Sequence, residues 1–238
     1  MMDETEPEKP HPVEQKYEVL EKGLKELDLY RPQIFTLLKK YIEEIERFNP
    51  AYGLVKVRCP EELIIKHILD SLAPIKIISS LLDEEKDTPA NPAPRRIADI
   101  GSGAGLPGLP LSICLPDADF TLIERSGRRA GFLQNCIAIL GLPNVKLEAI
   151  EMERVPAGSF DLAVFRAFRP LEQDILKNLF RLLKPRGLLA AWKGRYENIR
   201  EEMAAAEKFS PGVSWEIIPV KTPFLGEERH LVLIKSGE

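Results

Sequence analysis

The chain has 238 residues, of which 44% are hydrophobic and 29% are charged, as expected for one well-cored globular domain with a modest extension. No stretch approaches the roughly 20 apolar residues that a membrane span needs, and the acidic start differs from a signal peptide, so we expect a cytoplasmic protein with no membrane partner. The net charge of −4 does not exclude nucleic-acid binding, because the excess of acidic residues is confined to the start of the chain. Residues 1–30 hold nine acidic residues and four lysines, whereas the remainder holds 29 basic and 28 acidic residues.

The first 94 residues are predicted to be mainly helical. Residues 1–15 are polar and read as a disordered tail, and residues 16–94 as a helical extension that ends in a linker. Apolar residues at helical spacing predict two helices over 16–48, separated at Arg31-Pro32, and a third that begins near Pro60 and runs to residue 82. The proline-rich segment 83–94 is the linker.

Residues 95–238 are predicted to form an α/β domain. Apolar runs alternate with helical segments, which indicates βαβ units and a mainly parallel sheet. The last two runs are joined by a connection too short for a crossover helix, so they should pair antiparallel. The seven predicted strands are 96–100, 119–124, 144–150, 160–166, 187–193, 214–220 and 230–235.

The first strand of this domain leads into a glycine-rich loop. Gly101, Gly103 and Gly105 lie at alternate positions before a helix, where missing side chains let a ligand approach the backbone. A GxGxG run alone is weak, since it also occurs as a plain strand-to-helix turn. The next strand ends in Glu124, where an acid can accept hydrogen bonds from the ribose hydroxyls of an adenosyl ligand.

The identity of residue 106 decides between two adenosyl ligands. A dinucleotide fingerprint needs a third glycine there, but the residue is Leu106, whereas Gly105 completes the closer spacing typical of methyltransferases. S-adenosyl-L-methionine is therefore the predicted cofactor, and an NAD-dependent oxidoreductase is disfavoured.

The three cysteines do not suggest a metal or redox site. Cys59, Cys114 and Cys136 are far apart and form no CxxC pair, so we expect reduced structural residues and no bound metal.

Several motifs together resemble one family. KHILDS (66–71), DIGSGAGLPGLPLSI (99–113) and FRAFRPL (165–171), supported by WKG (192–194) and ERHLVLIK (228–235), are similar to the RsmG (GidB) 16S ribosomal RNA 7-methylguanosine methyltransferases over roughly residues 35–235. The resemblance implies a Rossmann-like class I methyltransferase sheet with an antiparallel C-terminal strand and a helical N-terminal extension. It also implies methylation of a guanine N7, with 16S RNA or the small ribosomal subunit as partner.

The resemblance implies further site residues. Besides the glycine loop and Glu124 in its ribose role, the cofactor contacts fall on Leu106, Met152, Glu153 and Arg166. Gly53, Val55 and Glu151 depart from the family pattern, which weakens the assignment of substrate contacts near them.

The predicted chemistry is mainly positioning, because guanine N7 carries a lone pair and no proton, so its methylation needs no general base. Basic residues follow successive strands at the edge where open α/β sheets bind ligands, and Arg166, which ends an apolar strand, is expected to link cofactor and substrate. The expected RNA-contacting residues are His67, Arg125, Arg128, Arg129, Arg169, Lys193 and Arg229.

Some alternatives stay open at this point. His67 is equally well explained as a helix-packing residue, and any single basic residue as ordinary surface. Phe165 and Trp192 are expected in the core, whereas Phe168 is an open candidate for base stacking. The activity itself has two rivals: methylation of another RNA base or a protein, and a nucleotide-sensing module without turnover.

Overall fold

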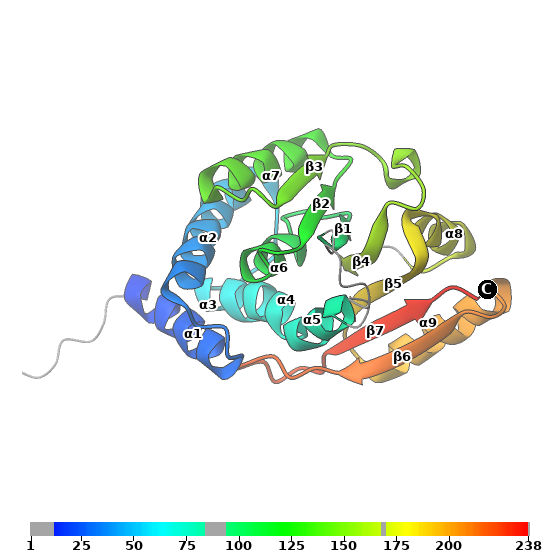
Figure 1. Cartoon of the computed structure of the whole chain (residues 1–238). Coiled ribbons are helices and arrows are strands. Elements are labelled where there is room, and N and C mark those ends of the chain that lie inside the picture. Colours follow the sequence, from blue (N-terminus) through cyan, green and yellow to red (C-terminus); the bar gives the residue numbers. More distant parts are fainter. Residues whose placement is uncertain (1–11, 84–93, 168–169, 238) are drawn as a thin grey trace, which may run out of the picture.

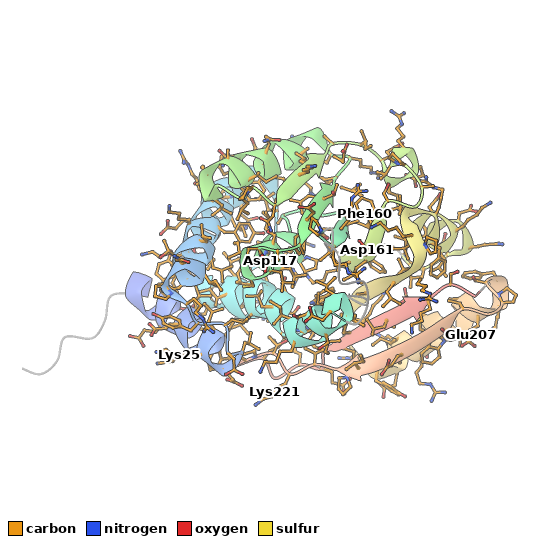
Figure 2. All side chains as sticks on the ribbon, in the orientation of Figure 1. Lys25, Asp117, Phe160, Asp161, Glu207 and Lys221 are labelled. Atoms are coloured by element: carbon orange, nitrogen blue, oxygen red, sulfur yellow. The ribbon has the colours of Figure 1, made fainter. Side chains whose placement is uncertain are left out.

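The computed structural model describes residues 12–83, 94–167 and 170–237, which form a seven-stranded sheet flanked by helices (Figure 1). The strand order is β3-β2-β1-β4-β5-β7-β6. Strands β1 to β5 are parallel, and β7 pairs antiparallel with both β5 and β6, as predicted for the last hairpin. The strands are β1 (Arg96–Ile100), β2 (Asp119–Ile123), β3 (Val145–Glu148), β4 (Phe160–Arg166), β5 (Leu183–Lys193), β6 (Ser214–Pro219) and β7 (His230–Lys235).

The helices cover both faces of the sheet. Helices α1 to α7 pack with one face through a single apolar core, which joins Leu24 and Tyr41 of the extension to Leu109, Leu122 and Leu231. Helices α8 and α9 pack on the opposite face. The helices are α1 (Pro12–Glu26), α2 (Pro32–Tyr52), α3 (Pro60–Leu63), a π-helix η1 (Ile64–Leu69), α4 (Asp70–Leu72), α5 (Ile75–Asp83), α6 (Gly108–Cys114), α7 (Gly127–Leu140), a 3₁₀ turn η2 (Met152–Arg154), α8 (Gln173–Leu182) and α9 (Tyr196–Phe209).

The two predicted parts of the chain, 16–94 and 95–238, share that first core. Figure 1 shows α2 beside α7, where Asn135 Nδ2 donates to Glu44 Oε2 at 2.7 Å and the Phe48 and Phe132 rings meet edge to face. At the other end, a Cβ on Gly23 would lie 2.3 Å from Leu69, so α1 crosses η1 at close range. The helical extension is therefore seated on the sheet.

Several predicted boundaries were wrong. Helix α2 runs through Pro50 to Tyr52, past the predicted end at residue 48. Helix α1 begins at Pro12, inside the predicted tail 1–15, because proline is well tolerated in a first helical turn. The third helix is interrupted by η1 and by a break at Ala73-Pro74, which a 3.6-residue apolar period does not reveal. Strand β5 starts at Leu183, before the predicted 187, because an irregularity in its pairing with β4 accommodates Pro185. Residues 1–11 of the tail and 84–93 of the linker lie outside the described residues.

Candidate functional site

The glycine loop leaves the carboxyl end of β1 in the conformation that the sequence predicted. Gly101, Gly103 and Gly105 have φ values of 66°, 60° and 88°, a region that other residues adopt only with strain. The amides of Gly101 and Ser102 both donate to the carbonyl of Ile123, at 2.9 and 3.2 Å, which fixes the loop to the end of β2.

The three glycines do not have the same role. A Cβ on Gly103 would meet only the Gly101 carbonyl, at 3.7 Å, so this part of the loop leaves room for a ligand. A Cβ on Gly105 would lie 2.5 Å from Leu109 Cδ1, and Leu106 is only 6% exposed. Gly105 and Leu106 therefore serve to pack the loop against α6, and neither lines the pocket described next.

Glu124 lies at the junction of this loop and a pocket, although its side chain is almost fully buried. Its Oε2 accepts from Gly103 N at 2.9 Å, and its Oε1 accepts from Ser126 N at 2.8 Å. Each carboxylate oxygen accepts about two hydrogen bonds, so each retains capacity for a ligand hydroxyl. Glu124 thus holds the loop in shape and still offers two acceptors.

The pocket, of about 200 Å³, opens beside Glu124 at the carboxyl ends of β1 and β2. Open α/β sheets bind ligands at this edge. It brings together six predicted site residues from three separate segments, and isoleucines contribute apolar wall. The lining residues are Ile100, Gly101, Ile123, Glu124, Arg125, Arg129, Ile150, Glu151, Met152, Glu153 and Ala167.

Arg166 ends β4 and is held by the π-helix η1 of the extension. Its Nη1 donates to the carbonyl of Lys66 at 3.0 Å and to Asp70 Oδ2 at 3.1 Å, and its Nη2 contacts His67 Nδ1 at 2.7 Å. Burial lowers the pKa of Arg166, but a guanidinium stays charged in proteins. These bonds use three of its five N–H groups, so it is both fixed and able to donate further.

Asp70 is a buried residue at the centre of the hydrogen-bond network around Arg166, and the sequence analysis did not single it out. Its buried carboxylate accepts from Arg166, from Arg229 Nε at 3.0 Å and from Thr222 Oγ1 at 3.2 Å. Its carbonyl accepts from Trp192 Nε1 at 3.1 Å. Through its carboxylate and its carbonyl, this one residue connects the extension, β4, β5 and the loop before β7. Its place in KHILDS was the only sequence signal.

His67 is neutral and internally bonded. Burial and the neighbouring Arg166 lower its pKa to about 4. Because Arg166 can only donate, His67 Nδ1 accepts, and the other ring nitrogen is left to bond the backbone of Lys56. This geometry favours the packing interpretation of His67, and direct contact with RNA stays a prediction.

Asp99 on β1 is a second buried acid near the site. Burial raises its pKa to about 7. Its Oδ2 accepts from Gly108 N at 3.1 Å, whereas Oδ1 has no hydrogen-bond partner among the described residues. An unbonded buried oxygen favours the neutral acid at this position.

The predicted RNA-contacting basic residues at the carboxyl edge of the sheet fall into two groups. Arg125, Arg128 and Arg129 are exposed at the start of α7, where Arg125 lies 3.9 Å from Glu151. Lys193 is paired with Glu202 at 2.8 Å, and Arg229 with Asp70 and Glu227.

Sequence alone could not foresee the main ion pairs, because Lys193 and Glu202 lie on different elements, β5 and α9, and Asp70 and Arg229 are 159 residues apart. Phe165 and Trp192 lie in the core as expected, and Phe168 and Arg169 lie outside the described residues.

Other chemistries find little support within the described ranges. These ranges contain no cluster of three or more metal-ligating side chains and no helix long and apolar enough to cross a membrane. Burial raises the pKa of Cys114 to about 12, and that of Cys136 as well, so neither thiol is activated as a nucleophile.

A mainly parallel sheet with an antiparallel β7, a glycine loop and an acid at the next strand end define a Rossmann-like fold of the class I methyltransferase type. Two solved structures have this fold: a S-adenosyl-L-methionine-dependent methyltransferase from Aquifex aeolicus (TM-score 0.53, 16% identity, 81% of this chain and 97% of that one) and a putative one from Methanococcus maripaludis (TM-score 0.54, 16% identity, 84% and 94%).

Sequence comparison shows to which family the chain belongs. The model of the GidB family, described as rRNA small subunit methyltransferase G, matches residues 34–232, and the chain belongs to that family. Relatives called ribosomal RNA small subunit methyltransferase G include those of Treponema denticola (37% identity, 92% of this chain and 94% of the relative) and Nitrosococcus oceani (37%, 91% and 94%).

Proposed function

We propose that this protein transfers a methyl group from S-adenosyl-L-methionine to N7 of a guanine in the 16S RNA of the small ribosomal subunit, in the cytoplasm. The observation that carries the proposal, in a member of this family, is an adenosyl-type pocket at Glu124 whose wall includes Ala167, the residue that follows the fixed Arg166 at the end of β4. The relatives named above carry this substrate class in their names.

The residues of the pocket fit the cofactor. Glu124 offers two acceptors suited to ribose hydroxyls, Gly101 lines the pocket, and the open backbone at Gly103 admits close approach. Met152 and the pocket isoleucines supply apolar surface for a purine ring. When bound, the cofactor supplies an electrophilic methyl group on a sulfonium sulfur.

The protein's own contribution to the reaction is orientation. Guanine N7 attacks with an in-plane lone pair and loses no proton, so no side chain needs to act as a base. This requirement agrees with His67, which is neutral and whose Nδ1 is occupied by Arg166. Arg166 keeps two N–H groups to donate, and its planar fork suits the O6 and N7 edge of guanine, so we assign it the task of holding the base.

The RNA backbone is assigned to the exposed arginines. Arg125 and Arg129 line the pocket, Arg128 is the exposed neighbour of Arg129, and all three can neutralise phosphates. We keep His67, Arg169, Lys193 and Arg229 as proposed RNA-side residues, with Lys193 and Arg229 reaching phosphate only if they exchange their carboxylate partners.

The test uses labelled S-adenosyl-L-methionine and small ribosomal subunits purified from a strain that lacks the corresponding enzyme. Label should enter the 16S RNA, and Arg166→Ala should abolish transfer while cofactor binding, measured by calorimetry, persists. Cofactor binding without transfer to any RNA would instead favour the sensing module, and label in ribosomal protein would favour a protein methyltransferase.

A further inference from the structure

An aromatic pair lies at the carboxyl edge of the sheet, outside the pocket. Tyr196 begins α9 directly after β5 and is 43% exposed, one of only three large hydrophobic side chains so exposed among the described residues. Its ring lies 5.9 Å from that of His230, the first residue of β7.

The pair is held rigidly. His230 Nδ1 lies 2.6 Å from the carbonyl of Gly194, so this nitrogen must carry the proton, and the ring orientation is fixed. Tyr196 N donates to Glu228 Oε2 at 3.3 Å. Because this aromatic surface is already fixed, little conformational entropy is lost when a flat ligand binds to it.

The sheet register places this pair close to the proposed base-holding arginine. Arg166 on β4 is level with Trp192 on β5, and Lys193 is level with His230 on β7. Adjacent strands are about 4.8 Å apart, so His230 lies two strands, or roughly 10 Å, from the end of β4. The exposed Arg195 precedes Tyr196, and Arg229 precedes His230. Figure 1 shows β5, β7 and α9 side by side.

We infer that Tyr196, supported by His230, is a stacking platform for an unpaired nucleobase that neighbours the methylated guanine. The inference rests on the proposed function. RNA is recognised mostly through unpaired bases stacked on aromatic side chains, and the exposed Arg195 beside Tyr196 matches the charge of an adjoining phosphate. An unpaired base next to the methylated guanine would lie at about this distance from Arg166.

The test measures steady-state methyl transfer at varied concentrations of unmodified small subunits, with the wild-type protein as the first arm. If the wild type methylates no RNA, the proposed function fails; if it does, the variants test the platform alone. Tyr196→Ala should raise KM for the subunit about tenfold, as expected for loss of one stacked base, while kcat and the Kd for S-adenosyl-L-methionine stay unchanged. Tyr196→Phe keeps the ring and should restore KM.

Ile139→Ala is the matched control, because Ile139 is 44% exposed near the end of α7, away from this edge, and should leave KM unchanged. If Tyr196→Ala unfolds, Tyr196→Leu retains apolar bulk without an aromatic face and should still raise KM. The platform is refuted if KM of the folded alanine or leucine variant equals that of the control, or if Tyr196→Phe is as impaired as they are.

Discussion

Replacing Asp70 with asparagine perturbs the residue that joins most elements of the site. The carboxylate is 5% exposed and accepts from two guanidinium groups. Asparagine keeps one acceptor and turns an N–H₂ group toward the other arginine, so one charged hydrogen bond is lost and a buried cation loses its counter-charge.

The expected cost follows from these contacts. Removing one partner of a buried ion pair costs about 3–5 kcal/mol, and the arginine side chains are still 15% and 20% exposed, which favours the lower end. A loss of about 3 kcal/mol in a chain of this length corresponds to a fall in Tm of roughly 6–12 °C. Because Arg166 also loses its anchor, kcat/KM for methyl transfer should fall about 100-fold.

Thermal unfolding followed by circular dichroism measures the first effect, and initial rates with saturating cofactor measure the second. Asp28→Asn is the matched control, because Asp28 forms an ion pair with Lys76 in which both side chains are more than two-thirds exposed, and it should leave Tm unchanged. If Asp70→Asn melts with the control and transfers methyl groups at the normal rate, Asp70 does not hold the site together.

Three further variants have distinct expected outcomes. Burial raises the pKa of Asp99 to about 7 from an ordinary 3.8, so the stability that its protonated form contributes is full below about pH 4 and lost as pH rises through 7. Urea titrations give the difference in free energy of unfolding between wild type and Asp99→Asn. This difference should fall by on the order of 4 kcal/mol between about pH 4 and pH 7. A constant difference would show that Asp99 is ionised throughout. Glu124→Gln should weaken S-adenosyl-L-methionine binding roughly 10- to 100-fold by calorimetry, since a charged acceptor is lost, and an unchanged Kd would place the ribose elsewhere. Gly105→Ala forces a Cβ against Leu109 at positive φ and should cost about 1–3 kcal/mol in chemical unfolding, whereas Gly131→Ala, on open helix surface, should not destabilise; equal stabilities would contradict the packing argument.

Much of the fold was predictable because its signals are local. Apolar runs such as 96–100 and 160–166 became strands at the predicted positions, and the short connection before 230–235 correctly required an antiparallel pair. The glycine loop and Glu124 were predictable for the same reason, since positive φ and a strand-end acid are written in a few adjacent residues.

What sequence reasoning missed depends on residues far apart in the chain. The π-helix changes the hydrogen-bond register without changing the apolar pattern, so the third helix looked continuous. The pairing of Lys193, at the end of β5, with Glu202 on α9 joins two different elements, and that of Asp70 with Arg229 spans 159 residues and exists only in the folded sheet. These contacts turn part of a predicted open basic rim into an internal network.

Because the members of this network bond to one another, the role of one residue cannot be assigned separately from the others. Arg166 bonds both His67 and Asp70, and Asp70 bonds Arg229, so a change at one position alters the charge felt by the others. Double variants within this set should therefore be non-additive.

The most direct test of the central claim is to digest the 16S RNA after reaction with the purified protein and to identify the methylated nucleoside by mass spectrometry and its position by primer extension. We expect a single 7-methylguanosine, absent with Arg166→Ala. A methyl group on another atom, or on several unrelated guanines, would contradict methylation of one oriented guanine N7 without a general base.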